Sequence, residues 1–206
     1  MDFPLSENVL LLGMFYSQDT PKSSWSSQGP RDRIRCIALE EKLHMNVYTL
    51  DDKHSELAVA GKHCQGDFSS HRLFTSLCST WQNKRFNSIC LDYFFSPQGW
   101  AADRWTKQFF IGTLPELCKQ NWLIPGGSVW LPNIRHVEEM LETYNEILSM
   151  YFRIEKKSNP HENPLFQGTE LCKTDLQKCI DNVTNDNELP KLASGSPFYC
   201  LVRIYD

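Results

Sequence analysis

Small and acidic residues, together with one aromatic residue, follow several short apolar runs of the chain. A glycine lets the backbone approach a ligand closely, and a carboxylate can accept hydrogen bonds from both hydroxyls of a ribose. An aspartate followed by an aromatic ring can accept a hydrogen bond from an adenine amino group while the ring stacks on the base. In chain order these residues predict a nucleoside-binding site formed by Gly13, Asp51, Asp52, Asp67 and Phe68.

A further apolar run, residues 88–91, ends at Asp92 and continues into the aromatic segment 93–97. Two interpretations of this segment stay open. The Asp92 carboxylate can face a binding site, or it can cap a helix or turn while the aromatic side chains fill the core. The same alternative holds for the nucleoside-binding residues, because glycine and aspartate also end strands as turn formers.

The residues of the predicted site need strands that end at one edge of a sheet. Each apolar run has the length of a strand buried on both faces, and helical patterns separate the runs, as in a mainly parallel sheet built from βαβ units. Ligands of such a sheet bind outside the carboxyl ends of the strands, where the strand order reverses. We therefore predict strands at residues 8–12, 46–50, 88–91 and 128–131, with a further short run at 63–65.

Apolar residues at helical spacing predict the helices between these strands. Pro115 is expected to break the second helix, because proline cannot donate a backbone hydrogen bond. Asn133 is the expected N-cap of the third and clearest helix. The three helices are predicted at residues 32–43, 100–121 and 135–149.

The end of the chain has a different pattern. Residues 151–154 and 198–205 predict two strands without a full crossover helix between them, which indicates an antiparallel pair at one sheet edge. A polar insertion at about residues 155–196 separates them, and a short helix at 171–180 is expected inside it. The whole chain, residues 1–206, fits one domain that can bury a core without disulfide bonds or a structural metal.

Charge and motifs exclude several classes of function. The formal net charge of −4 gives no general attraction to nucleic acid, although small basic clusters leave a local contact open. No cysteine or histidine spacing typical of a zinc site is present, and neither a G-x-S-x-G nor a Walker motif occurs. With no signal peptide and no membrane span expected, the eight cysteines indicate reduced thiols in an intracellular protein, cytoplasmic or nuclear.

The layout from Val9-Leu10-Leu11-Leu12-Gly13 to the last predicted strand resembles the class I S-adenosylmethionine-dependent methyltransferase superfamily. The resemblance covers most of the chain. It implies an α/β, Rossmann-like three-layer sandwich whose mainly parallel seven-stranded sheet ends in an antiparallel hairpin, with the last strand beside the fifth. The segment Leu123-Ile124-Pro125-Gly126-Gly127 is similar to the turn that many members carry before strand five.

The resemblance also implies S-adenosylmethionine as the cofactor. Gly13 would line its methionine part, Asp51 or Asp52 would bind the ribose, and Asp67 with Phe68 would bind the adenine.

Members that methylate amines place an acid or amide, prolines and an aromatic ring after strand four, where these groups hold the target amine. Asp92, Tyr93 and Pro97 are similar to these residues and are the candidate catalytic residues, although the adjacent proline pair of those members is absent.

The leading hypothesis is methyl transfer from S-adenosylmethionine to a small molecule, a nucleobase amine or a protein side chain. Members of the superfamily usually carry several glycines in the first loop, whereas here none follows Gly13 before Gly29. This departure favours an alternative, a catalytically degenerate methyltransferase-like module for binding or regulation. A third possibility is another Rossmann-like fold that binds a different nucleotide, although no G-x-G-x-x-G motif is present.

Overall fold

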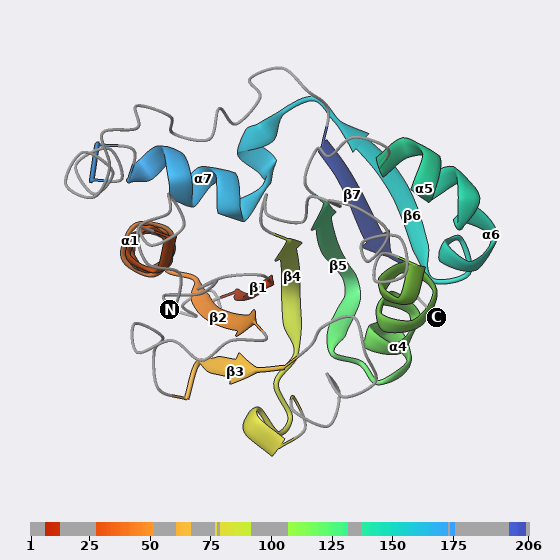
Figure 1. The fold of residues 1–206 in the computed structure, drawn as a ribbon, viewed down its shortest axis with the longest axis horizontal. Helices are drawn as coiled ribbons and strands as arrows, with labels where there is room; N and C mark the ends of the chain where they lie inside the picture. The colour runs from red at the N-terminus through yellow and green to blue at the C-terminus, as the bar shows by residue number, and fades with distance from the viewer. Residues whose placement is uncertain are drawn as a thin grey trace, which may run out of the picture.

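A computed structural model of the chain describes residues 7–12, 28–51, 61–66, 77, 79–91, 107–131, 137–172, 174–175 and 198–204. Seven strands form one sheet in the order β3-β2-β1-β4-β5-β7-β6 (Figure 1). The first five strands pair in parallel, and β7 runs antiparallel to both β5 and β6. The strands are β1 (Asn8–Leu12), β2 (Asn46–Asp51), β3 (His63–Gln65), β4 (Phe86–Leu91), β5 (Leu123–Leu131), β6 (Phe152–Lys157) and β7 (Phe198–Arg203).

The apolar runs form strands because both faces of the sheet are covered. In β1, Val9 and Leu11 belong to one buried cluster, and Leu10 and Leu12 belong to the other. Successive side chains of a strand point to opposite faces, so an unbroken apolar run fills both layers at once. The predicted α/β fold with a mainly parallel seven-stranded sheet and a terminal antiparallel hairpin is confirmed.

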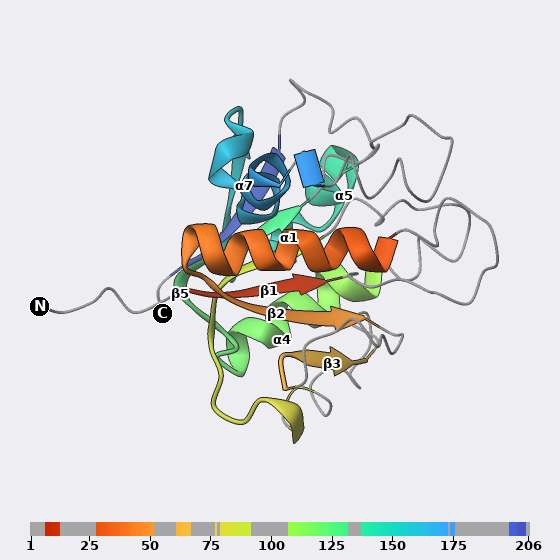
Figure 2. The same cartoon turned by 90° about the vertical axis from the view of Figure 1, so that its left-hand side faces the viewer.

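Two helices cover one face of the sheet. α1 (Gln28–Leu43) runs along this face and α7 (Pro164–Leu171) lies beside it (Figure 2). A Cβ atom on Gly168 would lie 2.9 Å from Cγ of Leu39, so the absence of a side chain at this position allows the two helices to pack closely. Beneath them the buried cluster contains Leu39, Leu165 and the strand residues Val9, Leu11, Val47, Cys90, Trp130 and Cys200.

The other face is covered by a π-helix, η2 (Phe109–Thr113), by α4 (Leu114–Lys119), and by α5 and α6. The helix was expected to break at Pro115, but the described residues 107–119 stay helical. Proline lacks an N–H group and its ring crowds the carbonyl four residues earlier. Here the turn before Pro115 is widened, with the Leu114 N–H bonded to the Phe109 carbonyl, and this wider turn accommodates the proline.

The helix predicted at 135–149 is two helices in the structure, α5 (Val137–Thr143) and α6 (Asn145–Leu148). Tyr144 separates them with φ −104° and ψ 10°, and its ring stacks on Phe110 at a centroid distance of 6.0 Å. Thr143 Oγ1 donates to the Glu139 carbonyl at 2.7 Å, a contact that bends helices. The predicted cap Asn133 lies outside the described residues.

Strand β5 differs from the prediction because it starts at Leu123, whereas residues 123–127 were expected to form a turn ahead of it. The pairing with β4 shifts between Phe86–Leu123 and Ser88–Ser128, so these residues form a bulge inside the strand. Gly126 adopts φ +74°, and a Cβ atom on Gly127 would lie 2.8 Å from the Ile124 carbonyl oxygen. The two glycines are therefore needed for the bulge.

Between β6 and β7 the structure describes α7, which begins earlier than the helix expected at 171–180. Residues 174–175 are also helical, and residues 173 and 176–180 lie outside the described part. Asn163 caps α7 by accepting a hydrogen bond from the Leu165 N–H at 2.9 Å, and Pro164 occupies its first turn. This Asn-Pro pair is a helix-start signal that the sequence contains.

Candidate functional site

The carboxyl ends of four strands meet at one edge of the sheet. Leu12, the last residue of β1, pairs with Leu50 of β2 and with Leu91 at the end of β4. Asp51, the last residue of β2, pairs with Gln65 at the end of β3. At about 4.8 Å between neighbouring strands, the four ends span roughly 14 Å. This is the scale of a small-molecule ligand.

The strand order reverses between β1 and β4. The chain passes from β1 outward through β2 to β3 and then returns to the opposite side of β1 as β4. Open α/β sheets bind their ligands at such a switch point, outside the carboxyl ends of the strands. Leu12 and Leu91 are 1% and 3% exposed, so the site edge is anchored in the core on both sides of the switch point.

The structure places Asp51 directly at this edge, as the final residue of β2. The other predicted cofactor-binding residues and the predicted catalytic residues lie outside the described part of the chain; these are Gly13, Asp52, Asp67, Phe68, Asp92, Tyr93 and Pro97. What the structure establishes is the position of the strand residues that precede them. Leu12, Asp51 and Leu91 directly precede Gly13, Asp52 and Asp92 in the chain.

A polar cluster that the sequence reasoning missed lies at the same edge, beyond the end of β5. Tyr199 of β7 pairs with Leu131 of β5 and with Lys156 of β6. The Tyr199 hydroxyl donates to Oε1 of Glu138, and Lys156 Nζ contacts the same oxygen at 2.7 Å. Lys156 also lies 5.7 Å from the centroid of the Tyr199 ring. Glu138 and Tyr199 are 61 residues apart, so no local sequence pattern relates them.

The described cysteines are buried and free. Burial raises the pKa of the Cys90 thiol, which lies against the backbone of Leu165, and raises the pKa of Cys200 to about 12. Burial also raises the pKa values of Cys64 and Cys172. A nucleophilic cysteine requires a lowered pKa, so these four thiols are packing groups and not thiolate nucleophiles.

Within the ranges that the structure describes, no group of three or more His, Cys, Asp or Glu side chains is placed to hold a metal ion. His63, in β3, shares a hydrogen bond of 2.9 Å between its Nδ1 atom and Oγ1 of Thr49. No helix in the same ranges is long and apolar enough to cross a membrane.

No family model and no curated protein matches the sequence. Among solved structures the chain is similar to a Plasmodium falciparum protein described as a ribosomal RNA methyltransferase, with 12% identity and a TM-score of 0.46. That alignment covers 97% of this chain and 86% of the other.

Two larger proteins are also similar. One is MycE, a methyltransferase of the mycinamycin biosynthetic pathway in complex with Mg and S-adenosylhomocysteine (11% identity, TM-score 0.40). The other is a Haemonchus contortus phosphoethanolamine N-methyltransferase in complex with phosphomonomethylethanolamine and S-adenosylhomocysteine (13% identity, TM-score 0.35). The alignments cover 97% and 99% of this chain but 45% and 50% of those proteins, so the chain spans about half of their length.

The mainly parallel seven-stranded sheet, the terminal antiparallel hairpin and the position of β7 beside β5 are those that the resemblance in the sequence implied. The chain therefore has the α/β, Rossmann-like fold that this resemblance implied.

Proposed function

We propose that the protein is an S-adenosylmethionine-dependent methyltransferase whose cofactor binds at the carboxyl ends of β1, β2 and β3. The observation that carries this proposal is the common register of the strand ends at the switch point, with Leu12 paired to both Leu50 and Leu91. This register brings Leu12, Asp51 and Leu91, which directly precede Gly13, Asp52 and Asp92, to one edge of the sheet, although they are far apart in the sequence.

The predicted cofactor-binding residues fit the cofactor by their chemistry. Asp51 or Asp52 would accept hydrogen bonds from the ribose hydroxyls, and Asp67 with Phe68 would bind the adenine by hydrogen bonding and stacking. Gly13 would allow the backbone to approach the methionine part. When bound, S-adenosylmethionine supplies an electrophilic methyl group on its sulfonium sulfur.

The protein's own contribution to the reaction would be alignment. Methyl transfer needs the acceptor atom, the methyl carbon and the sulfur in line, and holding reactants in that geometry supplies much of the rate enhancement. Asp92 would accept a hydrogen bond from the acceptor, with Tyr93 stacking on it and Pro97 shaping the loop. The acceptor is a small molecule, a nucleobase amine or a protein side chain, and the buried free cysteines support an intracellular setting in the cytoplasm or nucleus.

The first loop supports a second candidate function. Met14 and Phe15 follow Gly13, where other members of the superfamily carry further glycines, and their bulk would crowd a cofactor. A protein that had lost its cofactor would use the same fold as a binding or regulatory module.

Calorimetric titration of the purified chain with S-adenosylmethionine and with S-adenosylhomocysteine separates the two functions. The methyltransferase proposal expects saturable heat and a rise in the thermal midpoint with both ligands. The absence of both signals at millimolar ligand would overturn it in favour of the degenerate module.

A further inference from the structure

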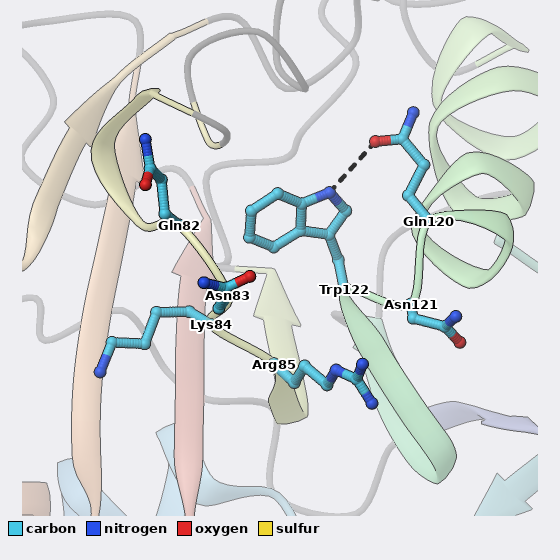
Figure 3. Close-up of a pocket in the computed structure, with 7 residues that line it drawn as sticks. All are labelled: Gln82, Asn83, Lys84, Arg85, Gln120, Asn121 and Trp122. Carbon is cyan, nitrogen blue, oxygen red and sulfur yellow. Dashed lines mark hydrogen bonds between the residues drawn. The ribbon is translucent and has the colours of Figure 1, made fainter.

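A pocket lies at the opposite edge of the sheet from the candidate methyl-transfer site. It has a volume of about 360 Å³ and lies between the segments that lead into β4 and β5 (Figure 3). This volume is within the range of small-molecule sites. The lining residues are Gln82, Asn83, Lys84, Arg85, Gln120, Asn121 and Trp122.

The composition of the pocket favours an anion. Its described lining contains two cations, four carboxamides and one indole, and no carboxylate. Lys84 and Arg85 make no ion pair with any described residue. A second hollow of about 150 Å³ shares Asn121 and adds Lys119 and Arg203 to the same side of the sheet.

The pocket is held by hydrogen bonds to the sheet. The Phe86 N–H donates to the Trp122 carbonyl at 2.7 Å, which joins the two lining segments where β4 and β5 begin. Asn8 Nδ2 donates to the Arg85 carbonyl at 2.8 Å. Asn83 and Asn121 adopt φ +64° and +57°, a left-handed conformation that asparagine tolerates better than most residues.

The internal hydrogen bonds decide which polar groups remain for a ligand. Gln120 is engaged on both sides, since Oε1 accepts from the Trp122 indole at 3.3 Å and Nε2 donates to Glu116 at 2.8 Å. Asn121 Oδ1 accepts from the buried guanidinium of Arg203 at 3.0 Å. The amide hydrogens of Asn121 and the guanidinium of Arg85 are therefore the donors that a ligand would meet, and both side chains extend to the same side of Trp122 (Figure 3).

We propose that this pocket binds the phosphate group of a small phosphorylated molecule, with Arg85 as the principal anion-binding residue. The guanidinium fork can donate two parallel hydrogen bonds to phosphate oxygens, and the Asn121 amide can donate to a third. Lys84 extends away from Arg85 (Figure 3), with its Nζ atom 5.6 Å from the centroid of the Tyr48 ring, so it adds positive charge to the pocket lining without meeting the same phosphate oxygens. Two cations match the double charge of a phosphate monoester.

The proposal is independent of the proposed methyl transfer. Arg85 directly precedes β4, and this strand of six residues, roughly 17 Å from Phe86 to Leu91, separates the pocket from the carboxyl ends where the candidate cofactor site lies. A variant that loses phosphate binding at the pocket is therefore expected to keep cofactor binding at the opposite edge of the sheet.

Titration calorimetry with ribose 5-phosphate, inorganic phosphate and ribose tests the assignment. Ribose 5-phosphate and phosphate should bind and ribose should not, and their affinity should fall as the salt concentration rises. Tighter binding of ribose 5-phosphate than of phosphate identifies a phosphate ester as the ligand, and equal binding identifies the free ion. Absence of binding by both phosphate-bearing probes at millimolar concentration would overturn the proposal.

Variants locate the binding. Arg85→Gln should weaken ribose 5-phosphate binding about tenfold or more, and adding Lys84→Gln should weaken it further. The matched control is Arg153→Gln with Lys107→Gln, because Arg153 on β6 is 68% exposed, Lys107 is exposed, and neither side chain lines the pocket. The indole N–H resonance of Trp122, assigned with Trp122→Phe, should shift during the titration. Unchanged affinity in Arg85→Gln, equal loss in the control, or an unmoved indole resonance would contradict the proposal.

Discussion

Leu12 and Leu91 are paired partners at the carboxyl ends of β1 and β4, the two strands on either side of the switch point. They are 79 residues apart in the sequence, and both are almost completely buried. Gly13 and Asp92 directly follow these two leucines in the sequence. The proposed methyltransferase assigns a cofactor residue and an acceptor residue to the positions that follow these two leucines in the chain, and this proposal can be tested by separating the two functions.

Asp51→Asn and Asp52→Asn should show which carboxylate binds the ribose. The variant that removes the binding carboxylate should weaken S-adenosylmethionine binding about tenfold or more, because hydrogen bonds to a charged acceptor are among the stronger ones in proteins. Titration calorimetry measures the affinity. Glu142→Gln, which removes an exposed carboxylate on α5, is the matched control and should bind as the wild type does. Wild-type affinity in both aspartate variants would exclude a ribose contact at the end of β2.

Asp92→Asn should separate cofactor binding from methyl transfer. We expect unchanged affinity for S-adenosylmethionine and a loss of transfer of about 10²-fold, because a misplaced acceptor lowers the rate without disturbing the donor. Transfer is measured as the incorporation of labelled methyl groups into acceptors of a cell extract. If the variant instead loses its cofactor affinity and its thermal stability together, Asp92 is a capping residue and the second interpretation of this segment holds.

Gly168→Ala should destabilise the protein, because its new Cβ atom would meet Leu39 of α1 at 2.9 Å. Overpacking of this kind costs about 1–3 kcal/mol, which exceeds the helix-propensity gain of alanine over glycine. Urea denaturation measures the free energy of unfolding. Gly112→Ala is the matched control, because nothing lies within 4 Å of a Cβ atom at that position. A stabilised Gly168→Ala protein would show that α7 does not pack closely on α1.

The stability of the fold should fall at alkaline pH through its buried thiols. Burial raises the pKa of Cys200 from 9.0 to about 12 and raises the pKa of Cys90 as well. The folded state then keeps these protons at pH values where the unfolded chain has lost them. The stabilising contribution is complete below the unfolded pKa and is lost as the pH rises through the folded pKa.

Urea denaturation at a series of pH values above neutral measures this loss, and Cys90→Ala should make the decline with pH less steep. Val9→Ala, which also removes a buried side chain from the same cluster, controls for the cavity and should keep the wild-type slope. Equal slopes in wild type and Cys90→Ala would assign the pH dependence to other groups.

Local patterns in the sequence are sufficient to predict several of the strands. The run from Asn8 to Leu12 is apolar at every position after the first, and this is sufficient to specify a strand that is buried on both faces. The same reasoning could not locate the break at Tyr144, because its neighbours have ordinary helical spacing and the contact that accompanies the break is a ring stack with Phe110, 34 residues earlier. The N-cap of α7 was predictable from the sequence, because the neighbouring residues Asn163 and Pro164 form a local helix-start signal.

For the candidate site, too, some features follow from the local sequence and others depend on the tertiary structure. The sequence by itself determined which residue types follow each strand, and the nucleoside-binding chemistry of the candidate site is a prediction from those side chains. Only the tertiary structure decided that Leu12, Leu50 and Leu91 end in register and that Tyr199 reaches Glu138 beside them. Register and strand order depend on hydrogen bonds and packing between segments that are far apart in the chain, and no local pattern encodes them.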